Sequence, residues 1–319
     1  MASVLPLADR FQALADPTRL RIVALLRIME LSVGELAHIL GQSQPRVSRH
    51  LKILADAGVL ERRKEGSWVF LTLAGVEQLE PLFALVDEWA DDSTRTLFAS
   101  DAARTEGIRA ERAEAANRYF TGHAAVWDQI RSLHVAESEV ERAIDRTLGK
   151  RPLGRLVDVG TGTGRMIELF GPRASQAIGI DRSSEMLRLA RVKLEAAGIH
   201  SSLRQGDMYA LPLEDGSADS VIIHQVLHYA HSPAAAIAEA ARVLASGGTL
   251  LVVDFAAHER EELRSTDAHI RLGFEDEVMA SWFAAAGLEM DRVEHLEGAE
   301  LTVTLWRGSK QNARQRRAA

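Results

Sequence analysis

The chain has 319 residues, of which 46% are hydrophobic and 26% charged, and its formal net charge at pH 7 is −7. This composition is typical of globular protein, and the length suffices for two ordinary domains. No run approaches the roughly 18 apolar residues of a membrane span, and the opening MASVLPLADR lacks the plan of a signal peptide. Cysteine is absent, which excludes disulfides and thiolate chemistry. We expect a cytoplasmic protein with no membrane partner.

The N-terminal part of the chain is predicted to form short helices followed by a β-hairpin. In LADPTRLRIVALLRIM, apolar side chains recur at helical spacing, and Pro17 fits the first helical turn. Ser32 and Glu35 predict the capping box of a second helix, SVGELAHIL. A third helix is predicted from Ser43, after the break GQS. The alternating pattern of VLERRKEGSWVFLTL then predicts two strands.

The third helix has the polar face of a DNA-reading helix in a helix-turn-helix. Val47, Leu51 and Leu54 are expected to face inward and the polar residues between them outward. Six basic residues stand against three acidic ones in residues 43–69. Gln and Arg can pair with base edges, and Arg and Lys can neutralise phosphates; the alternative is a structural three-helix unit with a solvated charged face. The candidate DNA contacts are Gln42, Ser43, Gln44, Arg46, Arg49, His50 and Lys52 in the turn and helix, and Arg62, Arg63 and Lys64 in the hairpin.

Residues 10–98, from LADPTRLRIVALL through SVGELAHILGQSQPRVSRHLKILADAGVLERRKEGSWVFLTL, resemble the ArsR/SmtB family of winged-helix repressors. The resemblance implies a homodimer that is built by the first and last helices of the domain and reads a palindromic double-stranded DNA operator. Metal-sensing members carry cysteines where this chain has Ser32 and Gly34. Others use Asp and His on the last helix, where this chain has no His between residues 75 and 100. We therefore expect no metal site here and a sensor elsewhere in the chain.

The pattern then predicts the boundary between two domains. An amphipathic helix over 76–98 completes a mainly α winged helix-turn-helix domain that spans 1–99. Residues 100–117 are polar and alternate in charge sign, and we expect them to be a partly helical linker. Helices in YFTGHAAVWDQIRSL and SEVERAIDRTL open a second domain over 118–309, which leaves a basic tail at 310–319.

Strands and helices alternate beyond Gly154. LVDV, AIGID, SVIIHQ and TLLVVDF are predicted strands, with a turn at Gly247-Gly248 before the last of them. RMIELF, SSEMLRLARVKLEAAG and PAAAIAEAARVLA are predicted helices. The helix EVMASWFAAAG and a hairpin of LEMDRVEHL and ELTVTLW close the chain. This order predicts a Rossmann-like, doubly wound α/β sheet with an antiparallel C-terminal hairpin.

A glycine loop, VDVGTGTGR, follows the first of these strands at Gly160 and Gly162, where a doubly wound sheet binds nucleotides. By itself this loop could serve a dinucleotide, S-adenosylmethionine (SAM) or only a tight turn. Asp181 ends the second strand, where a carboxylate can accept the ribose hydroxyls. Asp207, followed by Met208, ends a further predicted strand, SLRQGD, which precedes SVIIHQ along the chain and ends where adenine needs partners. These residues, the closing hairpin and the departure from GxGxxG favour SAM over NAD.

VDVGTGTG, GIDRS, GDMYALPL, SVIIHQVLHY and ARVLASGGTLLVVDF, in that order, resemble class I SAM-dependent methyltransferases. YFTGHAAVWD resembles the opening helix of the ubiquinone/menaquinone-type members, which lies over the cofactor. The resemblance implies that the methionine end of SAM, or of its product S-adenosylhomocysteine (SAH), lies at the glycine loop. The residues that it assigns to the cofactor are Tyr119, Asp158, Gly160, Gly162, Asp181, Arg182, Asp207, Met208 and His224.

The sequence leaves the chemistry of this second domain open. His224, His228, Tyr229, His231, His258 and His269 lie on its pocket side, and any of them is either a base for a methyl acceptor or an ordinary hydrogen-bonded loop residue. The absence of cysteine excludes arsenite as the acceptor. One function is a transcriptional regulator in which cofactor occupancy modulates operator affinity. The other is an active small-molecule methyltransferase with an autoregulatory DNA-binding domain.

Overall fold

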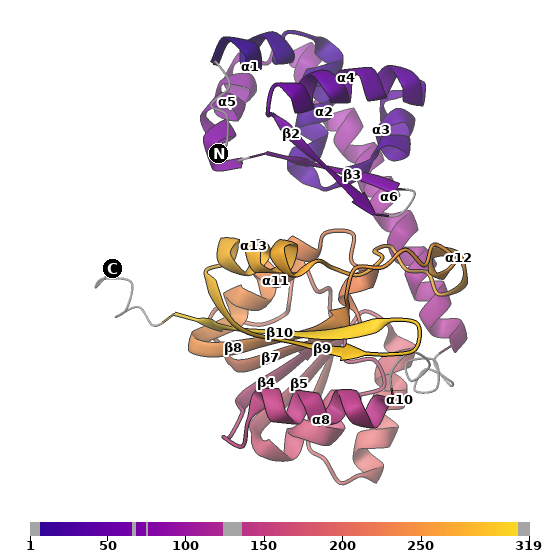
Figure 1. Ribbon diagram of the computed structural model, residues 1–319, viewed down its shortest axis with the longest axis vertical. Helices are drawn as coiled ribbons and strands as arrows, with labels where there is room; N and C mark the ends of the chain where they lie inside the picture. Colours follow the sequence, from indigo (N-terminus) through magenta and orange to yellow (C-terminus); the bar gives the residue numbers. More distant parts are fainter. Residues whose placement is uncertain (1–6, 66–67, 75, 124–135, 312–319) are drawn as a thin grey trace. The chain divides into compact units, whose positions relative to one another are not determined.

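The computed structural model describes residues 7–65, 68–74, 76–123 and 136–311. By its internal contacts the chain divides into two compact units, Met1–Glu114 and Ala115–Ala319. Figure 1 shows the helices and strands of each unit. None of the helices in the described segments is long and apolar enough to cross a membrane.

The first unit is a helical domain with a small antiparallel sheet. Its strands lie in the order β1-β3-β2, and the β2–β3 hairpin pairs Glu65 with Trp68 at its tip. The helix-turn-helix consists of α3 and α4, which agrees with the prediction. The elements are α1 (Leu7–Leu14), α2 (Pro17–Ile28), β1 (Leu31–Ser32), α3 (Val33–Leu40), α4 (Gln44–Asp56), β2 (Leu60–Glu65), β3 (Trp68–Leu73) and α5 (Val76–Trp89).

Local sequence signals fix where these helices begin and end. The Ser32 hydroxyl accepts a hydrogen bond from the Glu35 N–H at 3.3 Å, and the Glu35 carboxylate accepts one from the Ser32 N–H at 2.8 Å, so the capping box is confirmed. Gly41, with φ of +65°, ends α3 in the left-handed conformation that glycine adopts at little cost. Val47 and Leu51 are fully buried, as the helical pattern predicted.

The prediction of a single helix over 76–98 is wrong. α5 ends at Trp89, and a new helix, α6 (Asp92–His123), begins after Asp91. The Asp91 carboxylate accepts hydrogen bonds from the Thr94 N–H at 2.8 Å and the Ser93 hydroxyl at 3.0 Å. The bond from the Thr94 N–H satisfies one of the free backbone donors of the first helical turn, which explains why a new helix begins here.

Residues 100–117, expected to be a linker, lie entirely within α6, and the first unit extends to Glu114. Asp101 is 2% exposed and forms an ion pair of 2.6 Å with Arg21 on α2. Arg104 donates a hydrogen bond of 2.7 Å to the Ile39 carbonyl at the end of α3. The polar composition suggested a partly helical linker, but the segment is helical throughout and the side chains of Asp101 and Arg104 bind the rest of the first unit.

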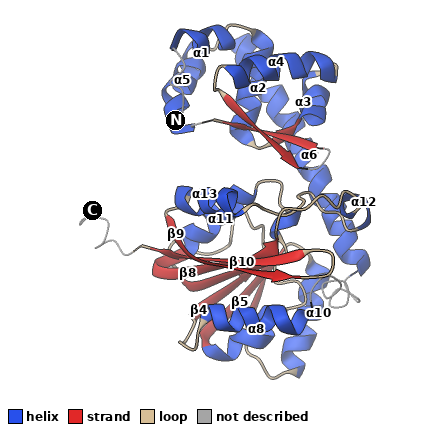
Figure 2. Ribbon diagram, in the orientation of Figure 1, coloured by secondary structure: helices blue, strands red, loops and turns tan. Residues whose placement is uncertain are grey.

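The second unit is a seven-stranded sheet in the order β6-β5-β4-β7-β8-β10-β9, with β10 antiparallel to both of its neighbours (Figure 2). The predicted doubly wound sheet with its C-terminal hairpin is confirmed. Its strands are β4 (Gly154–Val159), β5 (Ala174–Asp181), β6 (Ser202–Gln205), β7 (Ala218–His224), β8 (Leu244–Phe255), β9 (Leu288–Glu297) and β10 (Thr302–Lys310). Its helices include α8 (Glu137–Leu148), α9 (Arg165–Phe170), α10 (Ser184–Ala196), α11 (Pro233–Val243), α12 (Leu263–Thr266) and α13 (Asp276–Ala285).

Helices cover both faces of this sheet because its strands are apolar on both sides. In β4, Val157 packs in one core with residues of α11 and α13, whereas Leu156 packs in another with residues of α8 and α9. The predicted turn at Gly247-Gly248 instead lies within β8, which starts at Leu244. The pairing of β7 with β8 shifts register between Ala218 and Ser220, opposite these glycines.

Candidate functional site

The glycine loop leaves the carboxyl end of β4 and starts α9. Gly160, Gly162 and Gly164 have φ of +71°, +51° and +80°, a region that favours glycine. The Gly160 and Thr161 N–H groups donate hydrogen bonds to the Ile180 carbonyl, at 2.8 and 3.0 Å. The loop is therefore anchored to the neighbouring strand β5.

Gly160 is also required by a close approach from the next strand. A Cβ atom at Gly160 would lie 2.7 Å from Cγ2 and 2.8 Å from Cγ1 of Val226. Val226 follows the end of β7, so the β4 and β7 loops touch at this point. The absence of a side chain at Gly160 thus makes room for the loop that follows β7.

Two carboxylates hold the glycine loop in place at the carboxyl edge of the sheet. The Asp181 carboxylate, at the end of β5, accepts hydrogen bonds of 2.8 Å from the Gly162 N–H and the Ser183 N–H. Burial raises the pKa of the Asp181 carboxyl above its usual value, although these backbone donors oppose the shift. Asp158 is buried, and its carboxylate accepts a hydrogen bond of 2.6 Å from the Thr161 hydroxyl. Asp158 therefore stabilises the conformation of the glycine loop.

The loop after β6 carries the adenine candidates, Asp207 and Met208, both half-buried. The Gly206 N–H donates to the Asp181 carbonyl at 3.0 Å, which joins this loop to the end of β5. The Asp207 carboxylate accepts a hydrogen bond of 3.0 Å from the Tyr209 N–H. Burial raises the pKa of Tyr209 to about 12, and its hydroxyl accepts from the Ser232 N–H at 3.3 Å.

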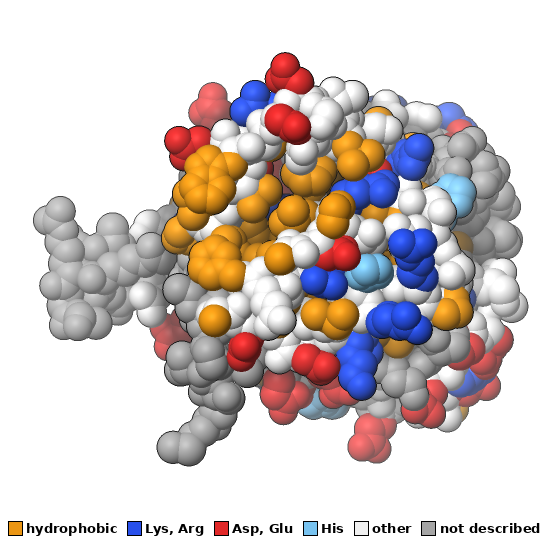
Figure 3. Space-filling view, turned by 90° about the horizontal axis from the view of Figure 1, so that it is seen from above, with side chains coloured by type: hydrophobic (Ala, Val, Ile, Leu, Met, Phe, Trp, Pro, Cys, Tyr) orange, Lys and Arg blue, Asp and Glu red, His pale blue; other side chains and the backbone are white. Residues whose placement is uncertain are grey.

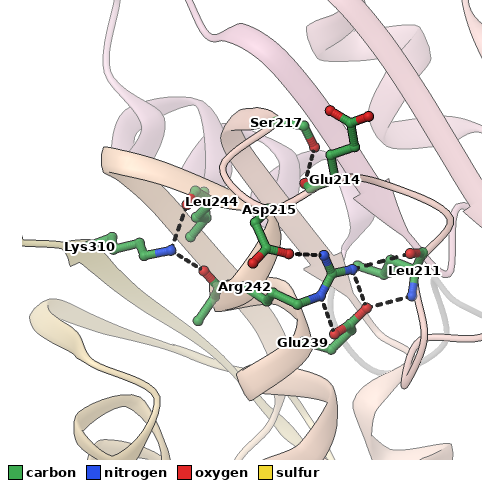
Figure 4. A network of polar contacts seen from close by, with 9 residues as sticks. Leu211, Glu214, Asp215, Ser217, Glu239, Arg242, Leu244 and Lys310 are labelled. Carbon is green, nitrogen blue, oxygen red and sulfur yellow. Dashed lines mark hydrogen bonds and ion pairs between the residues drawn. The ribbon is translucent and has the colours of Figure 1, made fainter.

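A polar network on α11 fixes the far end of the same loop (Figure 4). The Glu239 carboxylate accepts a hydrogen bond of 2.7 Å from the Leu211 N–H, and Arg242 donates to the Leu211 carbonyl at 3.3 Å. Arg242 also binds Glu239 at 2.7 Å and Asp215 at 2.5 Å. The Arg242 guanidinium lowers the pKa of the Glu239 carboxyl. Both backbone groups of Leu211 are thus held, a role that the sequence analysis did not assign.

The end of β7 adds His224, which is buried, and then a loop with unusual backbone geometry. Gln225 has φ of +49°, one of two residues other than glycine with positive φ in the described chain. Asp254, near the end of β8, accepts hydrogen bonds from this loop and from the His228 ring. Sequence reasoning named His228 as one of several candidate bases but did not single out Asp254.

The structure brings these residues together because the carboxyl ends of β4, β5, β6 and β7 meet at one edge of the sheet. Asp181 and Asp207 present carboxylate acceptors of the kind that the hydroxyl and amino groups of an adenosine require, at the edge where such sheets bind nucleotides. The exposed Arg182 lies beside Asp181. Tyr119 lies in α6, but its side chain is outside the described part of the chain. The donors and acceptors present here fit SAM.

The first unit presents the predicted recognition helix to solvent. Figure 3 shows one face of this unit, on which Lys and Arg side chains gather on one side and hydrophobic side chains on the other. The side chains of Arg63 and Lys64 lie outside the described part. The candidates that are exposed are Ser43, Gln44, Arg46, Arg49, Lys52 and Arg62.

Two of the candidate DNA contacts do not face solvent as expected. The His50 side chain is 14% exposed, and its Nδ1 lies 3.6 Å from Asp16, the residue that caps α2. The Gln42 amide donates a hydrogen bond of 3.2 Å to the Thr18 hydroxyl and is half-buried. The His50 side chain thus packs α4 against the start of α2. The Gln42 side chain joins the turn before α4 to the same end of α2.

Comparison with known proteins agrees with this division. Residues 16–62 match the family model of the bacterial regulatory proteins of the arsR family, and residues 157–252 match that of a methyltransferase domain. An HTH-type transcriptional regulator of Methanocaldococcus jannaschii is 39% identical over 82 residues, which are 25% of this chain and 91% of that protein. The demethylmenaquinone methyltransferase of Thermus thermophilus is 38% identical over 116 residues, which are 36% of this chain and 52% of that enzyme.

A solved SAM-dependent methyltransferase of Thermotoga maritima shares the fold of the second unit. Its TM-score is 0.50 at 23% identity, and the match covers 61% of this chain and 100% of that one. The first curated relatives are matched over 36% to 63% of their own length. The chain belongs to the HTH-type transcriptional regulators through its first unit, which carries an arsR-family region at residues 16–62, and a domain with the fold of SAM-dependent methyltransferases follows that region.

Proposed function

We propose that this protein is an operator-binding transcriptional regulator in which SAM or SAH, bound at the sheet edge of the second unit, changes the affinity for DNA. The proposal is supported by the presence, in one chain, of acceptors and a glycine loop that fit SAM and of an exposed basic helix in a helix-turn-helix. SAM would supply an activated methyl group. The chain's own residues would hold the ribose through Asp181 and the adenine through Asp207.

A second copy of the chain is the proposed partner of the first unit. A small and mostly apolar groove between α1, α2 and α5 is lined by Leu14, Leu20, Val23, Leu82 and Val86, together with the charged Arg27. Beside it, Phe11 on α1 is 50% exposed and Trp89 on α5 is 78% exposed. Large apolar side chains gathered at a surface favour association, and one helix-turn-helix reads only half of a palindromic site. Trp89→Glu is expected to shift sedimentation toward the monomer, and unchanged sedimentation would contradict this interface.

The DNA contacts are proposed for the exposed part of the candidate set. Gln44 and Arg46, in the first turn of α4, would reach base edges, as the first residues of a recognition helix do. Arg62 and the hairpin that carries it would lie on phosphates. An operator-binding role places the protein in the cytoplasm, where the DNA is.

We propose α6 as the route between the two activities. It is one continuous helix from Asp92 to His123, and the boundary between the units falls within it. The buried Arg21–Asp101 pair ties it to α2, a helix whose start contacts the recognition helix through His50. Tyr119 lies near the end of α6, so a cofactor that contacts it would act on the same helix.

The experiment measures operator affinity by fluorescence anisotropy, with and without SAH, on a duplex selected from a random pool by enrichment on this protein. We expect SAH to shift the operator dissociation constant by about 5- to 150-fold, the usual range of allosteric coupling. Coupling is reciprocal, so saturating operator must shift the calorimetric SAH affinity by the same factor. Identical SAH affinities with and without operator would refute the coupling and favour a methyltransferase tethered to an independent DNA-binding domain.

A matched pair of variants tests the route. Asp101→Ala removes the buried ion pair with Arg21 and is expected to reduce the coupling factor while the SAH affinity without DNA stays unchanged. Arg95→Ala removes an exposed ion pair of 3.9 Å with Asp92 on the same helix and is the control. Equal coupling in wild type and Asp101→Ala would refute α6 as the route.

A further inference from the structure

Asp254 is a buried carboxylate that the cofactor contacts do not explain. It is 0% exposed and lies near the carboxyl end of β8. One oxygen accepts hydrogen bonds from the Leu227 N–H at 2.9 Å and the His228 N–H at 3.2 Å. The other accepts from the Phe255 N–H at 2.8 Å and lies 2.7 Å from Nδ1 of His228. A buried carboxylate persists only where donors surround it, and here there are four.

These bonds hold the loop that follows β7. The Gln225 N–H donates to the Val253 carbonyl at 2.7 Å, next to Asp254, and Gln225 adopts a φ of +49°. Such a conformation costs free energy for a residue other than glycine and persists where the surroundings impose it. The loop then turns Val226 against Gly160. The Asp254 carboxylate and the Val253 carbonyl therefore fix the two neighbours of Val226, the residue that touches the glycine loop.

His228 completes the same arrangement. Its carbonyl accepts hydrogen bonds from the Ile270 N–H at 3.1 Å and the Arg271 N–H at 2.9 Å. Its ring lies 4.0 Å from the ring of Tyr229 and 4.2 Å from that of His269, measured between centroids. Because the partner of Nδ1 is a carboxylate, which accepts hydrogen bonds, Nδ1 is the protonated ring nitrogen and donates a hydrogen bond to Asp254. The loop is thus fixed from β8 and from the segment at residues 270–271.

We propose that Asp254 and His228 are positioning residues of the cofactor site, which act through Val226 on the glycine loop at Gly160. They set the shape of the subsite for the methionine end of SAM or SAH without contacting the cofactor. This inference rests on the proposed binding of SAM or SAH at the sheet edge. It predicts that the hydrogen bond from position 228 to Asp254, and not the imidazole itself, determines cofactor affinity.

Two substitutions at one position separate these alternatives. His228→Leu removes the donor to Asp254, whereas His228→Asn places an amide N–H close to the position of Nδ1. We expect His228→Leu to weaken SAH binding in calorimetry by about tenfold or more, the effect of losing one buried hydrogen bond to a charged group. His228→Asn is expected to bind within about threefold of wild type, well below that effect. Val226→Ala, which keeps the Asp254 cluster but removes its contact with Gly160, is expected to weaken SAH binding as well.

The control is a second His–Asp pair in the same unit. His295 lies on β9, at the far edge of the sheet, and its Nε2 is 3.1 Å from the Asp276 carboxylate. His295→Leu should leave the SAH affinity unchanged. All measurements are made where circular dichroism shows the variants folded; if His228→Leu does not fold, His228→Asn and Val226→Ala decide.

The outcomes distinguish the two levels of inference. Wild-type affinity in His228→Leu, or in Val226→Ala, would overturn the positioning role. Equal weakening in His228→Asn and His228→Leu would show that the imidazole, not the bond to Asp254, is what matters, and would also overturn it. Failure of the wild-type protein to bind SAH or SAM would instead refute the proposed function.

Discussion

The contact between Gly160 and Val226 makes Gly160→Ala a sharp test of the cofactor edge. A methyl group at Gly160 would lie 2.7 to 2.9 Å from three atoms of Val226, and the residue has φ of +71°. The left-handed conformation costs a residue with a side chain about 1–2 kcal/mol. Overpacking of a tight core adds about 1–3 kcal/mol. We expect Gly160→Ala to lower the free energy of unfolding of the second unit by about 2–5 kcal/mol.

Gly198→Ala is the matched control, because Gly198 has φ of +69° but nothing within 4 Å of its added Cβ. It should lose only the conformational part, about 1–2 kcal/mol. Hydrogen exchange of peptides from β4 and β7 measures the unfolding of this unit. Val226→Ala, combined with Gly160→Ala, removes the two Cγ contacts and should recover part of the difference. If Gly160→Ala destabilises no more than Gly198→Ala, the packing between the two loops is refuted.

Three further predictions concern the ligands. Asp181→Ala should weaken SAH binding by about 2–4 kcal/mol through the loss of a charged acceptor for two ribose hydroxyls. Burial raises the pKa of Asp181, and the ribose binds the ionised carboxylate, so the SAH affinity of the wild type in calorimetry should begin to fall at a higher pH than it would for an ordinary Asp. Asp181→Asn should flatten this pH profile. Arg46→Ala should reduce the binding free energy for the selected operator by about 1–3 kcal/mol and relax the sequence preference. Arg62→Ala should weaken binding to all duplexes alike and reduce the slope of log affinity against log salt concentration by about one. Equal losses on all duplexes for Arg46→Ala would contradict base readout. Arg242→Ala should weaken adenosine and SAH by the same factor, because its network holds the adenine loop, and a loss confined to SAH would contradict that role.

Much of the fold and of the site follows from short-range signals in the sequence. Ser32 and Glu35 lie three residues apart and cap α3 through their own local geometry, which no distant residue alters. Asp181 ends the strand β5 and Asp207 comes shortly after the strand β6, and the carboxyl ends of parallel strands meet at one edge, so the strand order brings them together. The order of strands and helices likewise predicted the doubly wound sheet.

Other features depended on which elements pack together. Asp101 stands in a polar stretch, and only the position of Arg21 on α2 makes it a buried partner. His50 lies beside the buried stripe of α4, where the capping end of α2 decides whether it faces solvent. Asp254 ends an apolar strand pattern like any strand-end carboxylate, but its donors at residues 227 and 228 precede it by 27 and 26 residues. Sequence periodicity specifies which face of an element is apolar, whereas the partner of each polar side chain is set by the tertiary contact that brings a donor to it.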